Sequence, residues 1–107
     1  MAHPIVVSDS NFSQEVLNSS IPVAVDFWAE WCGPCRMLSP IVEQVSDELA
    51  NSVKICKLNV DENPVAAADY NVMSIPTIII FKDGRVVDEL VGLMPKQQIV
   101  ERLKRFV

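Results

Sequence analysis

The stretch "VAVDFWAEWCGPCRMLSP", Val23–Pro40, changes its pattern halfway along. Its first part is almost continuously apolar, which is typical of a strand buried on both faces within a sheet that helices cover. After Gly33-Pro34 the apolar residues recur at helical spacing, and proline is favoured in the first turn of a helix. The stretch therefore predicts a buried strand that leads directly into a helix, with Cys32 and Cys35 at the junction.

The rest of the chain continues this alternation of strands and helices. Ser8 or Asp9 can cap a first helix, and Asp83-Gly84 indicates a hairpin turn between the last two strands. The resulting order predicts one α/β domain over residues 1–107, in which helices cover a mixed sheet. Besides the strand and helix described above, we expect strands at 4–8, 53–60, 76–81 and 86–92 and helices at 8–20, 61–71 and 95–106.

The composition restricts the classes of function. Of 107 residues, 50% are hydrophobic and 21% are charged, which is typical of a globular chain that folds without cross-links. The net charge of -5 argues against general nucleic-acid binding, which requires clustered Lys and Arg. The sequence contains neither an apolar run of membrane-spanning length nor a secretory signal. We expect no membrane contact and a cytoplasmic location, or an organelle stroma if a transit peptide was removed.

The cysteine pair has three interpretations. A structural disulfide between Cys32 and Cys35 closes a loop too short to constrain the unfolded chain much. A structural zinc site needs four ligands, and only Cys56 and His3 remain as candidates, without a second paired motif. A redox-active dithiol is favoured, because C-x-x-C beside a β-α-β pattern in a cytosolic protein is typical of this chemistry. We therefore expect no metal.

The helix start explains how this pair can react. Cys32 faces the unpaired N–H groups and the positive end of the helix dipole, which stabilise a thiolate and lower the pKa of the thiol. Cys35 lies one helical turn further on, so the two sulfurs can join in a disulfide. A bond that is easily made and broken suits electron transfer.

Four segments carry a resemblance to a known family. "VAVDFWAEWCGPCRMLSP", "KLNVDENP", "IPTIIIFKDGR" and "VGLMPK" resemble the thioredoxin family, at matching spacings along essentially the whole chain. The resemblance implies a five-stranded mixed sheet flanked by four helices and the activity of a general protein-disulfide reductase. It implies a monomer with no cofactor beyond the redox-active disulfide Cys32–Cys35. The implied partners are a thioredoxin reductase, NADPH- or ferredoxin-dependent, and client proteins that contain disulfides.

The resemblance also gives the two cysteines separate roles. It makes Cys32 the exposed thiolate that attacks a client disulfide, and Cys35 the buried thiol that resolves the mixed disulfide. Gly33 and Pro34 between them resemble the reducing members of the family, whereas oxidases and isomerases of this fold usually carry a histidine there. The dipeptide therefore predicts a reductase.

An acidic residue inside the apolar strand is the expected proton acceptor. Burial disfavours the charged form of Asp26 and raises its pKa, and a carboxyl poised near neutrality can take a proton from Cys35 and return it. The alternative is a structural aspartate that is hydrogen-bonded or paired with a lysine. By resemblance Lys57 lies near this carboxylate and tunes it; the alternative is a solvated strand lysine.

The resemblance places a client-docking surface around Pro76. It implies a cis bond before Pro76, which leaves the Ile75 backbone free to pair with an extended client strand, although base rates alone favour a trans proline. Trp31 adds a flat apolar wall, and Gly92 lets a partner backbone approach closely. Trp28 is expected to support the active site from the core rather than to contact clients.

Several residues depart from the usual pattern of the family. Arg36 replaces a frequent lysine, and Ser74, Leu93 and Met94 border the docking surface where smaller or different residues are common. Ser74, Leu93 and Met94 therefore bear on the choice of clients, and none of the four residues touches the mechanism. Cys56 is an additional thiol, and strand alternation predicts that it is buried and inert; regulatory oxidation is the alternative.

A second hypothesis belongs to another class of function. The chain can be a binding or accessory subunit in which the fold serves docking and the dithiol is dispensable. The presence of Cys32, Cys35, Asp26 and Pro76 argues against this as the sole role, because docking alone requires no proton chemistry.

Overall fold

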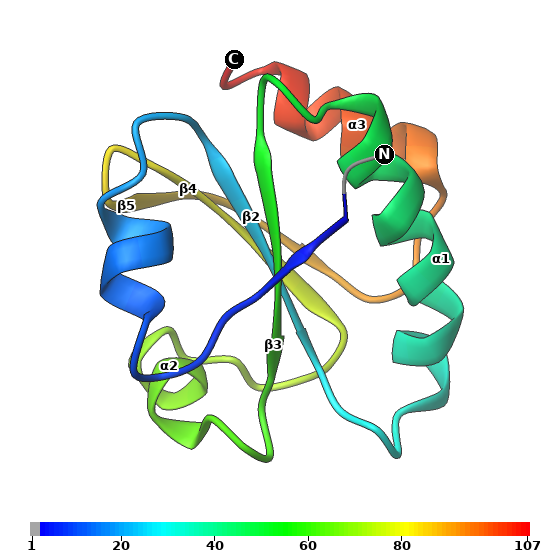
Figure 1. The fold of residues 1–107 in the computed structure, drawn as a ribbon. Coiled ribbons are helices and arrows are strands. Elements are labelled where there is room, and N and C mark those ends of the chain that lie inside the picture. The colour runs from blue at the N-terminus through cyan, green and yellow to red at the C-terminus, as the bar shows by residue number, and fades with distance from the viewer. Residues whose placement is uncertain (1–2) are drawn as a thin grey trace.

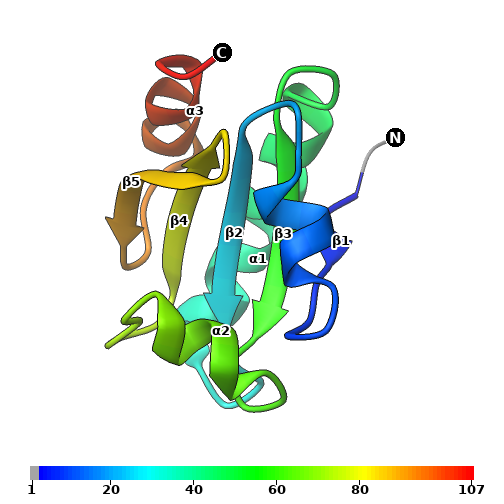
Figure 2. The ribbon, with the colours of Figure 1, turned by 90° about the vertical axis from the view of Figure 1, so that its left-hand side faces the viewer.

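A five-stranded mixed sheet runs through the middle of the protein in the computed structural model, which describes residues 3–107 (Figure 1). Its strands are β1 Ile5–Val6, β2 Val23–Trp28, β3 Lys54–Asn59, β4 Thr77–Lys82 and β5 Arg85–Val91. They lie side by side in the order β1-β3-β2-β4-β5 (Figure 2). β3 is parallel to β1 and β2, whereas β4 is antiparallel to β2 and β5. The mixed sheet predicted from the sequence is confirmed.

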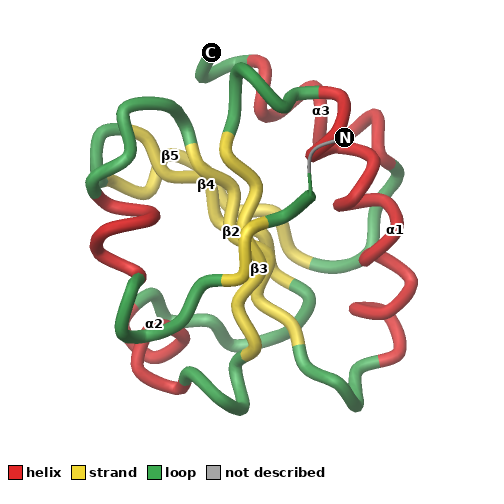
Figure 3. Tube along the Cα trace, in the orientation of Figure 1, coloured by secondary structure: helices red, strands yellow, loops and turns green. Residues whose placement is uncertain are grey.

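Helical elements cover both faces of this sheet. They are the short π-helix η1 Ser13–Leu17 and the helices α1 Gly33–Glu48, α2 Pro64–Asp69 and α3 Lys96–Lys104. α1 and α3 lie on one side of the strands, and η1 and α2 lie on the other (Figures 1 and 3). This arrangement confirms the five strands and four helices that the family resemblance implied. Within residues 3–107, no helix is long and apolar enough to cross a membrane.

Two apolar cores result, one on each side of the sheet. The core beneath α1 and α3 includes Leu38, Val42, Val45, Ile99, Val100 and Leu103. The core beneath η1 and α2 includes Phe12, Val16, Phe27, Cys56 and Phe81. Successive residues of β2 from Val23 to Phe27 are all buried, because their side chains alternate between the two sides of the sheet. The strand that leads into the cysteine pair is thus fixed from both faces.

The first helix is shorter than the sequence predicted. We expected helix over residues 8–20, but only Ser13–Leu17 forms η1, and Phe12 at its start provides no side-chain cap. The Asp9 carboxylate instead accepts hydrogen bonds from the backbone N–H groups of Val65 and Ala66 in α2. Asp9 therefore caps α2 and not the first helix.

The hairpin of β4 and β5 forms where the sequence placed it. Asp83 and Gly84 have φ values of 54° and 76°, as the two-residue turn of a tight hairpin requires. The pairing shifts by one residue between Ile80 and Phe81, so that Val87 is an extra residue in β5. Such a bulge bends and twists the strand that contains it.

Candidate active site

The two cysteines lie where β2 gives way to α1. Cys32 has extended backbone (φ -86°, ψ 109°) and occupies the N-cap of α1, and Gly33 and Pro34 form the start of the helix. The Cys35 backbone N–H donates to Cys32 Sγ over 3.2 Å, and the two residues are joined by a disulfide with a Cα–Cα distance of 5.2 Å. The predicted junction and disulfide are confirmed. The helix N-terminus directs an N–H group at the sulfur on which negative charge develops when the bond is reduced.

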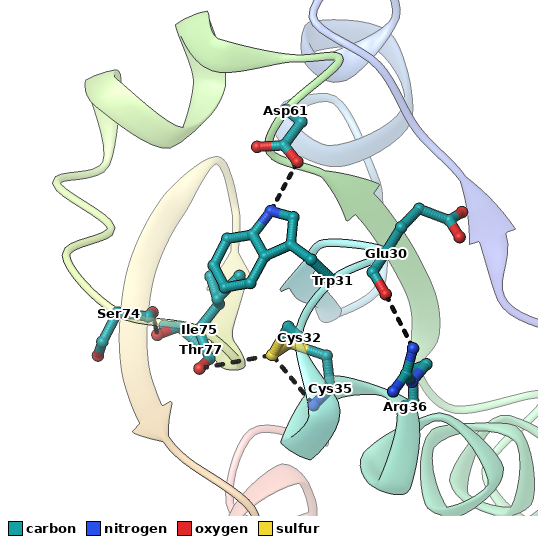
Figure 4. The surroundings of a disulfide bond; sticks show 9 residues. All are labelled: Glu30, Trp31, Cys32, Cys35, Arg36, Asp61, Ser74, Ile75 and Thr77. Atoms are coloured by element: carbon teal, nitrogen blue, oxygen red, sulfur yellow. Dashed lines mark hydrogen bonds between the residues drawn. A yellow bond between two sulfur atoms is a disulfide. The ribbon is translucent and has the colours of Figure 1, made fainter.

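Cys32 is less accessible than the sequence analysis suggested. Its exposed fraction is 4%, against 2% for Cys35, so the expectation of one exposed and one buried cysteine is wrong for this disulfide form. Cys32 and Cys35 form a small apolar cluster with Ala29, against which Trp28 and Ile75 pack. Cys32 Sγ lies 3.9 Å from the Ile75 carbonyl oxygen (Figure 4). The neighbouring loop therefore covers the sulfur that an incoming thiolate must reach.

Asp26 is buried in the middle of β2, and most of its neighbours are apolar. Its side chain is 2% exposed, and Oδ1 has no hydrogen-bond partner among residues 3–107. A cavity of about 10 Å³ beside it is otherwise lined by apolar residues, which include Ala24, Val42 and Ile78. Burial raises the pKa of the Asp26 carboxyl from 3.8 to about 7, and the positive charge of Lys57 opposes part of this rise. The group can therefore change its protonation state near neutral pH.

Lys57 lies next to Asp26 across the β2–β3 pairing, as the resemblance implied. Its ammonium group donates to Ser39 Oγ over 3.0 Å and lies 4.8 Å from the centre of the Trp28 ring. Among residues 3–107 it forms no ion pair with Asp26 within 4.0 Å. Lys57 thus acts on the carboxyl through space, while Ser39 and Trp28 hold its own position. Trp28 is half-buried at the end of β2, consistent with a supporting role.

The segment around Pro76 faces the cysteines. The Ile75–Pro76 peptide bond is cis, which confirms the prediction from the family resemblance. The Gly92 N–H donates to the Pro76 carbonyl over 2.8 Å, and Gly92 has φ 96°, a conformation that side chains disfavour. The Ile75 N–H has no partner among residues 3–107. The backbone at Ile75 therefore carries an unpaired N–H group beside the disulfide.

An open groove of about 340 Å³ lies beside the disulfide. It is lined by Trp31, Val60, Ala67, Val72, Met73, Ser74 and Ile75. The exposed fractions of Trp31 and Met73 are 69% and 88%, which are high for large apolar side chains. The groove offers a largely apolar surface next to the site of chemistry. Pro34 also borders the cysteines and is exposed.

Cys56 lies apart from the redox pair. It is fully buried in the core beneath η1 and α2, as strand alternation predicted, whereas the redox pair belongs to the separate cluster around Ala29. Burial raises the pKa of the Cys56 thiol to about 12, mainly through desolvation. Within residues 3–107, no three His, Cys, Asp or Glu side chains are grouped so that they could hold a metal ion.

We expect Cys56 to be unreactive in the folded, reduced protein. Its thiol is buried and protonated at neutral pH, and the thiolate is the reacting species. Alkylation with iodoacetamide at pH 8, followed by peptide mass spectrometry, should label Cys32 and leave Cys56 unlabelled until denaturant is added. Rapid labelling of Cys56 under native conditions would favour the alternative of a regulatory thiol. A Cys56→Ala variant provides the matched control for assignment of the label.

Two further residues, Ser39 and Asp61, contact the site. Ser39 follows Cys35 by about one turn of α1, so helical spacing alone could have indicated that it shares the face of Cys35. Asp61 accepts a hydrogen bond of 2.8 Å from the indole N–H of Trp31, which comes from a distant segment of the chain. No local pattern in the sequence signals that contact.

Comparison with known proteins agrees with this geometry. A family model described as thioredoxin matches residues 3–105. Thioredoxin 1 of Synechococcus elongatus is 50% identical over 105 residues, which cover 98% of both chains. The thioredoxins of Synechocystis sp. and Pyropia yezoensis are 50% and 48% identical over 101 residues, which cover 94% of both chains in each case. The chain belongs to the thioredoxin family, and it is a protein-disulfide oxidoreductase that acts by thiol-disulfide exchange.

Proposed function

We propose that this protein is a general reductase of protein disulfides in which Cys32 attacks and Cys35 resolves. In the reduced protein the Cys32 thiolate attacks one sulfur of a client disulfide, and the other client sulfur leaves as a thiolate. Cys35 then loses its proton and attacks Cys32 Sγ, which breaks the mixed disulfide and releases the second client thiolate. Two electrons pass to the client, which gains two thiols, and the Cys32–Cys35 disulfide forms.

The hydrogen bond from the Cys35 N–H to Cys32 Sγ is the observation that carries this assignment. It stabilises negative charge on Cys32 rather than on Cys35, because only Cys32 lies at the N-cap, where helix N–H groups are unpaired. A lower pKa at Cys32 provides a thiolate at neutral pH, and the thiolate is the species that attacks the client disulfide. Thioredoxins are themselves a standard example of a cysteine pKa lowered in this setting.

Asp26 is the proposed proton acceptor for Cys35, and Lys57 tunes it. With a pKa of about 7, the carboxyl is partly ionised at neutral pH and can both take and return a proton. No other acidic side chain is buried to the same extent among residues 3–107. The Lys57 ammonium group keeps the carboxylate form accessible, because its positive charge lowers the pKa that burial raises.

Clients are proposed to dock across the Ile75–Pro76 segment. An extended client chain can pair with the free Ile75 N–H, while Trp31 forms an apolar wall. Gly92 lies beside Pro76 and has no side chain, so a client backbone can approach this edge closely. Trp28, Gly33 and Pro34 support the geometry of the cysteine loop rather than bind the client.

The proposed setting is that of a soluble electron carrier. The chain acts as a monomeric single domain over residues 1–107, in the cytoplasm or in an organelle stroma. Its oxidised disulfide is regenerated by a thioredoxin reductase, either NADPH- or ferredoxin-dependent. We propose no cofactor besides the disulfide, and no function in nucleic-acid binding.

Trapping on a Cys35→Ser variant tests the division of roles. Because serine cannot resolve the mixed disulfide, the variant should remain covalently bound to a client such as insulin, and dithiothreitol should release it. Non-reducing electrophoresis and mass spectrometry measure the adduct. A Cys32→Ser variant is the matched control and should form little or no adduct. A stronger adduct through Cys35 than through Cys32 would reverse the assignment.

A further inference from the structure

Within residues 3–107, one side-chain hydrogen bond holds the Trp31 ring in place. The indole projects into solvent beside the disulfide, and its Nε1–H donates to Asp61 Oδ2 over 2.8 Å. Figure 4 shows the ring between Asp61 and the cysteine pair, so that the hydrogen bond fixes the ring from the side away from the sulfurs. An exposed ring without such a contact samples several rotamers. Its orientation therefore depends on Asp61.

Asp61 is itself anchored by the turn between β3 and α2. Asn59 Oδ1 accepts hydrogen bonds from the backbone N–H groups of Asp61 and Glu62 over 2.9 and 3.3 Å. The Asn63 side chain donates to the Asn59 carbonyl over 3.1 Å. These bonds leave the Asp61 carboxylate free for Trp31, while they fix the backbone from which it projects.

The turn is further tied to the N-terminal segment. Asn63 Oδ1 accepts a hydrogen bond from the Asp9 backbone N–H over 2.9 Å, and the Asp9 carboxylate accepts from the first N–H groups of α2. The anchor of Trp31 thus draws on two parts of the chain that are distant in sequence, residues 59–66 and the segment at Asp9. Such an arrangement is stiffer than a turn held by its own residues alone.

We propose that Asp61 is a positioning residue that acts through Trp31 and sets the wall of the client groove. Trp31 lines this groove together with Val60 and Ile75, beside the disulfide. If the ring is already fixed before the client binds, binding does not lose the entropy of ordering it. The inference rests on the proposed docking of clients and adds the residue that prepares their surface.

The expected effect of Asp61 is on client binding and not on the chemistry of the sulfurs. An Asp61→Ala variant should raise the half-saturating concentration of insulin by about three- to tenfold, the effect expected when one side chain must be ordered on binding. Its maximal rate should change by less than about twofold. Reduction of bis(2-hydroxyethyl) disulfide, a small neutral molecule that needs no groove, should proceed at the wild-type rate.

Two variants separate the hydrogen bond from the charge. Asp61→Asn keeps an oxygen acceptor and should restore most of the insulin affinity. Glu62→Gln removes a neighbouring exposed carboxylate and should leave both substrates unaffected. Equal weakening by Asp61→Ala and Asp61→Asn would mean that Asp61 acts by its charge on the client, and the proposal would be wrong.

The indole proton gives an independent reading. The chain has two tryptophans, so a Trp31→Phe variant assigns the two indole N–H signals in an NMR spectrum. The Trp31 signal should exchange with water faster in Asp61→Ala than in wild type, while the Trp28 signal should not change. Unaltered exchange at Trp31 would overturn the proposed anchoring of the ring.

A double variant decides whether Asp61 acts through Trp31. In a Trp31→Ala background, adding Asp61→Ala should not weaken insulin binding further. Additive losses would overturn the proposal, as would an unchanged insulin dependence in Asp61→Ala alone. Failure of wild type to reduce insulin at any concentration would instead refute the proposed reductase, and the two failures are therefore distinguishable.

Discussion

Replacement of Cys32 by serine is expected to lower the rate of insulin reduction by about a thousandfold or more, because a hydroxyl at neutral pH supplies almost no nucleophilic anion. The Cys35 N–H that now stabilises the sulfur cannot compensate, since the pKa of a serine hydroxyl lies far above that of a thiol. Turbidity of the precipitating insulin B chain, with dithiothreitol as electron donor, measures the rate. The uncatalysed reaction with dithiothreitol sets the baseline.

The matched control for this prediction is Cys56→Ser. Cys56 lies in the core beneath η1 and α2, outside the cluster that contains the disulfide, so this variant should keep the wild-type rate once its folding is verified by circular dichroism. Full activity in Cys32→Ser would contradict the proposed attack by Cys32. It would leave docking, without redox chemistry at this site, as the better account of the fold.

Replacement of Asp26 by asparagine is expected to stabilise the protein at pH 8. An acid whose pKa rises from 3.8 in the unfolded chain to about 7 in the folded protein reduces the free energy of unfolding by on the order of 4 kcal/mol above neutral pH. Between these pKa values the unfolded chain has lost the proton and the folded protein has kept it. Stability therefore falls as pH rises through that window. Asparagine has a similar shape and no such proton.

Denaturation in urea at several pH values measures this effect. The Asp26→Asn variant should exceed wild type by roughly 2–4 kcal/mol at pH 8 and match it closely at pH 3.5, where both side chains are neutral. Glu101→Gln, at an exposed position on α3, is the matched control and should change little at either pH. The Asp26→Asn variant should also resolve the mixed disulfide more slowly. Equal stability of this variant and wild type at pH 8 would mean that Asp26 is not buried as a poised acid.

The buried strand and the helix start could be predicted because their signals are local. Val23 to Phe27 form a nearly continuous apolar run. Gly33-Pro34 favours a helix start, because proline fits the first helical turn. The cis bond at Pro76 could be anticipated only from the family resemblance, because a proline in sequence looks the same in either isomer.

Other features depend on partners that no local pattern specifies. The capping signal at Asp9 serves α2, and Asp61 serves Trp31, across separations of tens of residues. The burial of Cys32 depends on how the Ile75 segment packs over the disulfide. In each case the residue type indicated a polar or reactive role, and only the tertiary structure revealed its partner.

The extra residue in β5 has a consequence for the proposed docking site at Pro76. From the turn outward, Phe81 pairs with Val86, but after the bulge Ile80 pairs with Asp88 and Thr77 with Val91. The shifted count brings Gly92 opposite Pro76, where its N–H reaches the Pro76 carbonyl. With uniform pairing, Val91 would lie opposite Pro76 and place a branched side chain at this edge of the sheet. One extra residue near the turn of the hairpin thus determines which residue of β5 lies opposite Pro76 at the far end of the strand pair.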